Sequence, residues 1–277
     1  MTRFSLFFVQ QQAKQYYIFP LPKSNIYQKI QQLEIPQSGK IINLDEQQQL
    51  LIADAQQNFH LNFHYQAKAC QQDWSKVKLK KTDSKHFSQD QYLNYLDPQM
   101  QALASDWIAG EKDLKKITVL LYEQTLQYLN YGQPIKGLYP YSQALKEKTT
   151  DCGGFATFLI TLLQTQGLFA RLAVGYLLKN NYQQKIKNVL NLTHHWSDLE
   201  MHAWLELLTA DGQYLALDPA VDWRYRHGMS RRFATFTNLP ADRLLISYGH
   251  NHQLQYFNKQ HHWPILQHPE LIKDDHV

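Results

Sequence analysis

The chain has 277 residues, of which 44% are hydrophobic and 13% aromatic. This composition excludes a disordered chain and is enough for one main folded domain with an accessory one. The 28 basic and 24 acidic residues leave a formal net charge of +4, and the charges are spread along the sequence. Because no nucleic-acid-binding pattern accompanies this small charge, we expect neither DNA nor RNA as a partner.

The sequence has only two cysteines, Cys70 and Cys152. Two widely separated cysteines make no disulfide framework, which favours a reducing compartment. The apolar run from Phe4 to Val9 is too short for the core of a signal peptide. No stretch approaches the roughly 20 apolar residues that span a bilayer. We therefore expect a cytoplasmic protein that does not enter a membrane.

Residues 1–92 are predicted to form a β-rich N-terminal region. Apolar and polar residues alternate from Phe59 to Tyr65, which is the pattern of a half-buried strand. Shorter runs of this kind cover residues 6–9, 16–19 and 77–79. The basic stretch 76–81 alternates lysines with apolar residues and is interpreted as an edge strand with a solvated face.

Helical patterns dominate the next part, within a second predicted domain, 93–277. Amphipathic runs cover residues 100–109, after Pro98, and 113–129. A loop at 131–141 then leads to the best-defined helix, which begins near Cys152. Its buried face repeats at helical spacing in Phe155, Phe158, Leu159, Leu162 and Leu163. Asp151 or Thr150 can cap its start, and Gly167 stands where a left-handed stop is expected.

The segment after this helix is predicted to be a central strand, 168–178, a long polar loop, 179–200, and a β-hairpin. A turn at 210–212 would pair Thr209 with Gln213. Continued along both strands, this register places His202 opposite Ala220 and diagonal to Asp218 on the same face. The odd-numbered positions of the hairpin are apolar, so we expect them to form the core (Met201, Ala203, Leu205, Leu207, Leu215 and Leu217).

The candidate catalytic residues are Cys152, His202 and Asp218. A thiol, an imidazole and a carboxylate can act as nucleophile, base and orienting acid. A helix N-terminus favours the thiolate, and the first-turn backbone N–H of Cys152 could bind an oxyanion. Gly153 and Gly154 carry no side chains that would block a substrate, so we predict that they contact it.

Each of these residues also has an ordinary structural explanation. Cys152 on an apolar helix face could be an inert core residue, and His202 could be a satisfied sheet histidine. Asp218 before Pro219 could simply form a turn. Trp204, on the same strand face as His202, either walls the site as a substrate contact or packs in the core.

Two further aspects of the site stay open. The side-chain donor of an oxyanion hole could be any of four polar residues upstream of the helix (Gln133, Tyr139, Tyr141 and Gln143). A histidine-rich stretch could suggest a metal (His194, His195, Glu200 and His202), but its spacing matches no zinc pattern. We predict neither a metal nor another cofactor.

Four sequence blocks in order resemble the transglutaminase-like superfamily. They are Asp-Cys-Gly-Gly-Phe-Ala at 151–156, Gln-Gly-Leu-Phe-Ala-Arg at 166–171, His-Ala-Trp-Leu-Glu at 202–206 and Leu-Asp-Pro-Ala at 217–220. The resemblance covers roughly residues 98–225. It implies an α+β, papain-related fold in which the nucleophile helix packs on an antiparallel sheet, with Cys152, His202 and Asp218 as the triad. The chain departs from the family's usual pattern at two places. It has Leu168-Phe169 where the family usually has Ile-Pro, and it has Thr150 instead of a glycine two residues before the cysteine.

The resemblance implies a cysteine-dependent acyl-transfer enzyme that acts on amide or peptide bonds through a thioester. We expect hydrolysis, as in a cysteine protease or amidase, rather than cross-linking, and a protein or peptide as the substrate. The alternative is a non-catalytic transglutaminase-like scaffold whose cleft binds a peptide. The substrate and the oligomeric state are not predicted.

Overall fold

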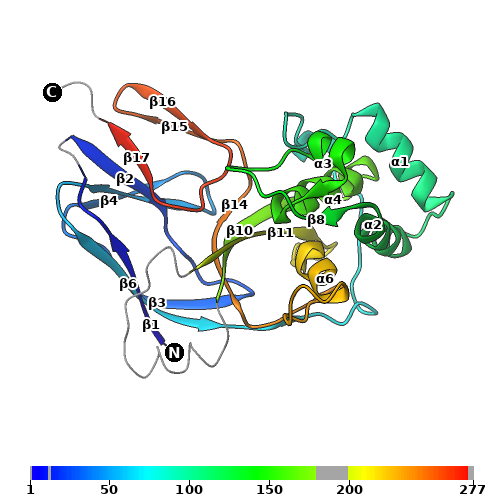
Figure 1. The fold of residues 1–277 in the computed structure, drawn as a ribbon, viewed down its shortest axis with the longest axis horizontal. Coiled ribbons are helices and arrows are strands. Elements are labelled where there is room, and N and C mark those ends of the chain that lie inside the picture. The colour runs from blue at the N-terminus through cyan, green and yellow to red at the C-terminus, as the bar shows by residue number, and fades with distance from the viewer. Residues whose placement is uncertain (1, 12–13, 179–198, 274–277) are drawn as a thin grey trace. The chain divides into compact units, whose positions relative to one another are not determined.

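A computed structural model of the chain describes residues 2–11, 14–178 and 199–273 (Figure 1). The chain divides into two compact units, each made of segments that are distant in the sequence. The first comprises Met1–Ala69, Val174–His202 and Ala241–Val277, and the second comprises Cys70–Ala173 and Ala203–Pro240. The predicted loop at 179–200 lies almost entirely outside the described residues.

The first unit contains a three-stranded antiparallel sheet in the order β1 (Thr2–Phe8), β6 (Phe59–Ala67), β3 (Gln28–Glu34). The alternation predicted for 59–65 is confirmed, because Phe59, Leu61, Phe63 and Tyr65 are buried while the residues between them are not. β1 contributes Phe4, Leu6 and Phe8 to the same core. One face of this sheet therefore forms the main hydrophobic core of the unit.

A four-stranded antiparallel sheet completes the first unit, in the order β17 (Glu270–Lys273), β2 (Gln15–Pro20), β5 (Gln49–Asp54), β4 (Gly39–Asn43). β15 (His252–Tyr256) and β16 (Lys259–Trp263) form a hairpin. Because β17 pairs with β2, residues beyond 241 belong to the same compact unit as the N-terminal strands. The domain boundary predicted between residues 92 and 93 stays a prediction.

Two strands carry the chain from one unit to the other. β10 (Ala170–Leu177) and β11 (Glu200–Leu208) belong to a sheet in the order β12 (Tyr214–Leu217), β11, β10, β14 (Arg243–Tyr248). The central position predicted for the strand at 168–178 is confirmed. Gly175 lets β14 approach, since a Cβ atom there would lie 2.0 Å from the carbonyl oxygen of Leu244.

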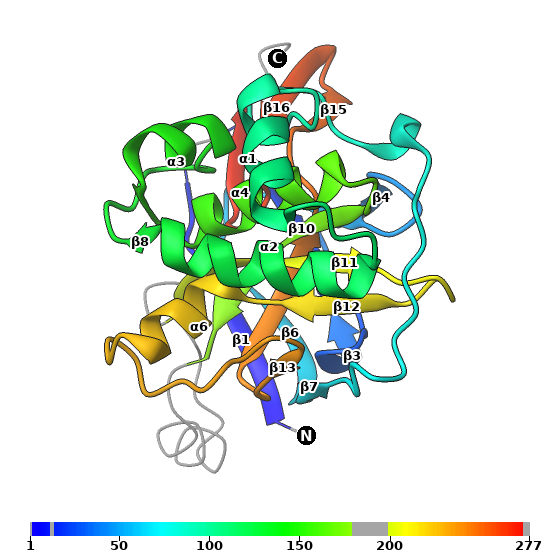
Figure 2. The same ribbon diagram turned by 90° about the vertical axis from the view of Figure 1, so that its right-hand side faces the viewer.

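The second unit holds the helices, which gather around α4 (Cys152–Thr165) (Figure 2). α1 (Pro98–Ile108), α2 (Leu114–Tyr128), α3 (Tyr141–Glu147) and α6 (Pro219–Arg226) all pack against it. Twelve of the 14 residues of α4 are consequently buried. Asp97, Asp113 and Asp151 cap α1, α2 and α4 by accepting bonds from first-turn N–H groups. These three helices begin where the sequence predicts them.

Short elements complete the second unit. β8 (Asn130–Tyr131) runs parallel to β9 (Thr149–Thr150), and β7 (Cys70–Gln71) pairs with β13 (Asn238–Leu239). A 3-10 turn, η1, spans Ser84–His86. The chain is therefore a mixed α/β protein with several antiparallel sheets, as predicted. In the described ranges, no helix has the length and apolar character needed to cross a membrane.

The structure has two helices that were not predicted and lacks one strand that was. Helices α3 and α6 were not expected, and residues 77–79 form no strand. The segment 76–81 keeps its alternation, with Val77 and Leu79 half-buried between exposed lysines. A bond from Ala210 N to Lys78 O, 2.8 Å, ties it to the hairpin turn, but one such bond does not make a strand ladder.

Candidate active site

Cys152 is the first residue of α4 and is partly exposed. Asp151 caps the helix, because its Oδ1 accepts a bond from the N–H of Gly154, 3.1 Å. Its Oδ2 accepts a longer bond from the N–H of Ile135, 3.3 Å. The cysteine thus lies at the positive end of a buried helix, where first-turn amides have no partner within the helix.

Backbone bonds fix the approach to Cys152. Asn130 N donates to Lys148 O, 2.7 Å, and Gly132 N donates to Thr150 O, 2.8 Å. The loop at 131–141 is anchored on α4, since Thr157 Oγ1 donates to Tyr139 O, 2.9 Å. Leu138 and Tyr139 are buried. The loop at 131–141 is therefore packed onto the first turns of α4.

This packing requires a glycine at position 154 and leaves little room for a side chain at position 153. A Cβ atom on Gly154 would lie 1.8 Å from Thr150 Oγ1, and one on Gly153 would lie 3.3 Å from a methyl carbon of Leu138. Both glycines are buried. Close approach of the preceding strand and loop thus explains these residues, and their predicted contact with substrate stays a prediction.

His202 lies on β11, at the end of the segment Val174–His202 of the first unit, and is 1% exposed. Its backbone carbonyl accepts a bond from Gln267 Nε2, 3.1 Å. The same amide nitrogen also donates to the carbonyl of Gly175. The Gln267 side chain therefore joins β10 and β11 at this position, a contact that the sequence pattern did not reveal.

Asp218 belongs to the second unit and caps α6 rather than extending β12. Its Oδ1 accepts a bond from Val221 N, 3.1 Å, and the side chain is completely buried. The predicted hairpin register is confirmed from Leu208–Tyr214 to Leu205–Leu217. Its predicted continuation to His202 and Ala220 is wrong, because Pro219 lacks an N–H and begins a helix.

Helix α6 is tied to α2 and α4 by buried side chains. The rings of Trp223 and Phe155 lie 6.3 Å apart, and Tyr122 Oη donates to Asp222 Oδ2, 2.9 Å. Burial and the Asp222 carboxylate raise the pKa of Tyr122 well above its usual value. Burial also raises the pKa of Asp222, against hydrogen bonds from Arg226 and Tyr122. The helix that carries Asp218 is thus held by a network of buried polar groups.

The even-numbered residues of β11 are buried as well, so this strand has no open face in its middle. Trp204 is 0% exposed and Glu206 is 1% exposed. Met201, expected in the core, is exposed because it lies near the start of the strand. The complete burial of Trp204 is consistent with a packing role. The contact of Trp204 with a substrate stays a prediction.

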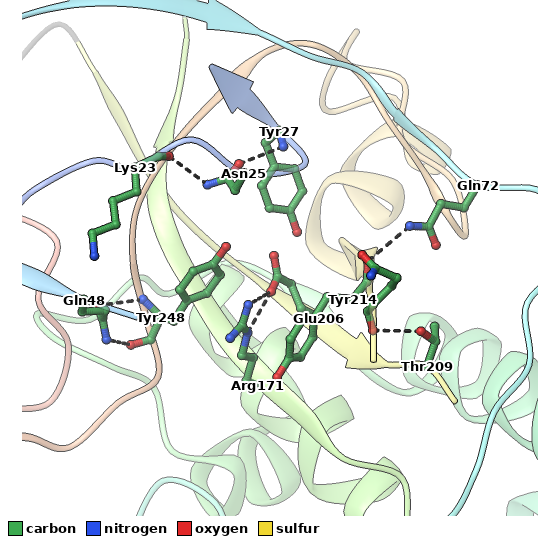
Figure 3. A network of polar contacts seen from close by, with 11 residues as sticks. Lys23, Asn25, Tyr27, Gln48, Gln72, Arg171, Glu206, Thr209, Tyr214 and Tyr248 are labelled. Carbon is green, nitrogen blue, oxygen red and sulfur yellow. Dashed lines mark hydrogen bonds and ion pairs between the residues drawn. The ribbon is translucent and has the colours of Figure 1, made fainter. Parts of the chain in front are cut away.

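Glu206 binds Arg171, the residue that the sequence places on the central strand (Figure 3). Nε and Nη2 of Arg171 donate to the same oxygen, Oε2, over 2.8 and 2.6 Å. The guanidinium lies 3.6 Å from the ring centroid of Tyr214. Gln72 Nε2 in turn donates to Tyr214 O, 3.2 Å. The arginine therefore stabilises the hairpin from inside the second unit.

The candidates for an oxyanion donor have different surroundings. Tyr139 Oη donates to the Glu147 carboxylate, and burial together with this bond raises the pKa of Tyr139 to about 12. Tyr141 Oη donates to Asp97 Oδ2, 2.8 Å, and Gln143 Nε2 donates to Glu147 Oε1, 3.1 Å. Gln133 is exposed, with a left-handed backbone, φ 49°. Three of the four side chains are thus engaged in structural hydrogen bonds.

Metal ligands are not grouped in the part of the chain that the structure describes. No cluster of three or more His, Cys, Asp or Glu side chains there could hold a metal ion. His194 and His195, which the sequence raised as metal candidates, lie outside the described residues. Cys70 is buried on β7.

Comparison with known proteins agrees with the sequence blocks. A family model for the transglutaminase-like superfamily matches residues 101–219. No curated protein matches the chain. Among solved structures, one from Cytophaga hutchinsonii, described as a "Putative Cysteine Protease", has a TM-score of 0.54 at 15% identity. The match covers 100% of this chain and 90% of that one.

A second similar structure is the periplasmic domain of TgpA from Pseudomonas aeruginosa, with 13% identity and a TM-score of 0.40 over 80% of this chain and 75% of that one. A likeness this weak carries no argument. The Cytophaga structure supports the fold over the whole chain, and the family model adds the specific sequence pattern. Residues 101–219, which include Cys152, His202 and Asp218, match the model of the transglutaminase-like superfamily, and the chain has an α+β fold similar to that of the Cytophaga structure.

Proposed function

We propose that this chain is a cysteine hydrolase that cleaves amide bonds in proteins or peptides. The observation that carries the proposal is the position of Cys152, which begins the buried helix α4 inside the segment that matches the superfamily. His202 and Asp218 lie in the same segment. The name of the similar Cytophaga structure, a cysteine protease, favours hydrolysis over cross-linking.

In the proposed reaction, His202 takes the thiol proton and the Cys152 sulfur attacks the amide carbonyl carbon. The carbonyl electron pair moves to oxygen, and its return breaks the C–N bond as His202 gives the proton to the leaving amine. The product is a thioester on Cys152. Water, losing a proton to His202, then attacks the thioester, and the carboxylic acid leaves as the thiol is restored.

The other residues of the site would position these groups. Asp218 would accept a hydrogen bond from the second ring nitrogen of His202 and stabilise the imidazolium. The backbone N–H of Cys152, in the first turn of α4, would donate to the oxyanion. Because Asp151 already accepts a bond from Gly154 N, its carboxylate holds the helix start. His202 must outweigh the negative charge of Asp151 beside the thiolate.

A thiol-labelling experiment tests the nucleophile. With iodoacetamide and mass spectrometry, Cys152 should react at least about tenfold faster than the buried Cys70, because only an activated thiolate reacts quickly at neutral pH. His202→Ala and His202→Gln should both slow labelling of Cys152, whereas the same changes at the exposed His86 should not. Circular dichroism verifies that the variants are folded. Equal, slow labelling of both cysteines would overturn the proposal.

Turnover then separates hydrolysis from the alternatives. A peptide library digested by the chain should yield cleaved peptides, and Cys152→Ala should lower the rate by at least about a thousandfold. Products joined to an added amine would instead indicate cross-linking. Rapid labelling of Cys152 without either product would favour a peptide-binding scaffold.

A further inference from the structure

The C-terminal end of α6 and the turn that follows it, drawn as a ribbon in Figure 2, have a sequence rich in arginine. Residues 223–241 contain four arginines and no aspartate or glutamate. Arg226, the last residue of α6, binds two carboxylates, those of Asp222 and Glu123, over 2.8 and 2.6 Å. Of the two arginines that follow in the turn, Arg231 is exposed.

Three large apolar side chains are exposed in the same region. Tyr225 is 41% exposed, Met229 57% and Phe233 49%. The rings of Tyr225 and Phe233 meet edge to face, with centroids 5.0 Å apart. Neighbouring exposed apolar side chains, rimmed by polar residues, mark a candidate interaction surface. We call Tyr225, Met229, Arg231 and Phe233 the α6-end surface.

The turn that carries this surface is held by hydrogen bonds. The N–H groups of Met229 and Ser230 both donate to Arg224 O, over 2.8 and 3.1 Å. Gly228 has a left-handed backbone, φ +70°, which permits the turn, and Arg232 N donates to Ser230 Oγ, 3.0 Å. Because the backbone is already ordered, a ligand would pay little entropy to organise it.

One residue of the α6-end surface, Tyr225, lies on the helix that Asp218 caps. Eight residues separate the two ends of α6, which at 1.5 Å per residue is about 12 Å, the length of roughly four extended residues. Arg224 also lies over the ring of Tyr131, 5.0 Å from its centroid, and that ring faces Phe155 of α4. The surface is thus connected through packed side chains to the helix that begins with Cys152.

We propose that the α6-end surface binds an acidic stretch of a protein substrate, with an aromatic or other large apolar side chain among the acidic ones. Arg231 would form an ion pair with a carboxylate of the substrate. The rings of Tyr225 and Phe233, together with Met229, would cover its apolar side chain. This inference rests on the proposed function, because it names the substrate class of the same site.

The test measures binding and needs no turnover. Two fluorescent peptides are titrated into the Cys152→Ala chain: a glutamate-rich peptide with one phenylalanine, and the same peptide with glutamine at every glutamate. The first should bind at least about tenfold more tightly at low salt, and added salt should reduce the difference. Arg231→Glu should remove the preference and Phe233→Ser should weaken binding of both peptides. Lys80→Glu, an exposed charge reversal in the same unit, should change neither.

Every outcome decides the proposal. It is overturned if the peptides bind equally, if neither binds, or if the preference survives Arg231→Glu. Vesicles of phosphatidylserine and phosphatidylcholine are tested in parallel. Vesicle binding that depends on Arg231, without a peptide preference, would overturn it and identify a lipid surface instead. Failure of Cys152-dependent cleavage would contradict the proposed function, whereas this titration reports on the surface alone.

Discussion

The side chain of Gln28 pairs with the backbone of Leu245 as a neighbouring strand would. Its Nε2 donates to Leu245 O, 2.9 Å, and its Oε1 accepts from Leu245 N, 2.8 Å. Leu178 N binds Asp242 O, so the backbone groups of Asp242 and Leu244 are directed toward β10 and those of Leu245 toward the outer edge of the sheet. The carboxamide therefore covers an edge that would otherwise be open to pairing with another chain. The side chain of Gln48 also bonds both backbone groups of one residue, Tyr248, over 2.7 and 3.1 Å (Figure 3).

Removing the Gln28 carboxamide should destabilise the first unit. In Gln28→Ala, the buried N–H and C=O of Leu245 lose their partners, which we expect to lower the free energy of unfolding by about 1–3 kcal/mol. Gln28→Glu should cost at least as much, because a carboxylate cannot donate to Leu245 O. Urea denaturation measures both. Gln31→Ala, at an exposed position of the same strand, is the matched control, and an equal loss there would contradict the interpretation.

Gly154→Ala should disturb the start of α4. The new Cβ would overlap Thr150 Oγ1, so either strand β9 or the helix must shift, at a cost of about 1–3 kcal/mol. Thermal unfolding and the labelling rate of Cys152 measure the effect on stability and on the thiol. Gly132→Ala, whose Cβ would meet only a methyl group at 3.2 Å, should cost less. The double change Gly154→Ala with Thr150→Gly should recover part of the loss, and no recovery would argue against this steric cause.

The Arg171–Glu206 pair should behave as a coupled unit. Glu206→Leu alone leaves the arginine without its carboxylate in a nearly buried position, and we expect a loss of about 3–5 kcal/mol. Replacing both residues by leucine should cost less than Glu206→Leu alone, because no charge is then stranded. A double-mutant cycle from urea denaturation gives the coupling energy. Additive losses would show that the two side chains do not depend on each other.

The first unit should become less stable as the pH decreases, because of His252. Burial, with a smaller effect from the charges of His250 and His262, lowers the pKa of His252 from 6.5 to about 4, against the attraction of Asp45. The unfolded chain therefore binds a proton between pH 6.5 and 4 that the folded chain does not. Stability is full above pH 6.5 and declines through this window, by about 3 kcal/mol in total.

His252→Gln should flatten this dependence between pH 4 and 6.5. Urea denaturation at several pH values provides the measurement. His86→Gln, at an exposed position of the second unit, serves as the matched control and should keep the profile of the unchanged chain. A steep profile that persists in His252→Gln would assign the pH dependence to other groups.

Local sequence patterns were sufficient to predict helix α4 and the register of the hairpin. The spacing of Phe155, Phe158 and Leu162 predicts α4, and the turn at Gly212 predicts the hairpin register, because both follow from neighbouring residues. Helix α6 escaped prediction because its short sequence, Pro-Ala-Val-Asp-Trp-Arg-Tyr-Arg, has little apolar periodicity and depends on packing against α2 and α4. The role of Gln28 could not be predicted, since its partner lies 217 residues away.

In the candidate site, too, features set by adjacent residues could be predicted and contacts between distant segments could not. The cap by Asp151 and the place of Cys152 at the helix start follow from adjacent residues. Asp218 was expected on a strand because Leu215 and Leu217 alternate, and only the following proline hints that the chain turns there. The clamp that Gln267 places on His202 and Gly175 joins three distant segments, which no local pattern records.

The pairing of β17 with β2 has a consequence for synthesis on the ribosome. β2 emerges early, whereas its partner at Glu270–Lys273 leaves the exit tunnel only after the whole of the second unit has been made. The N-terminal strands must therefore wait with an unfilled sheet edge while the helices around α4 emerge and pack. A chain that waits in this way is exposed to wrong pairing. In the other sheet of the unit, the outer strand β3 exposes only polar and charged side chains, which reduce that danger (Lys29, Gln31, Gln32 and Glu34).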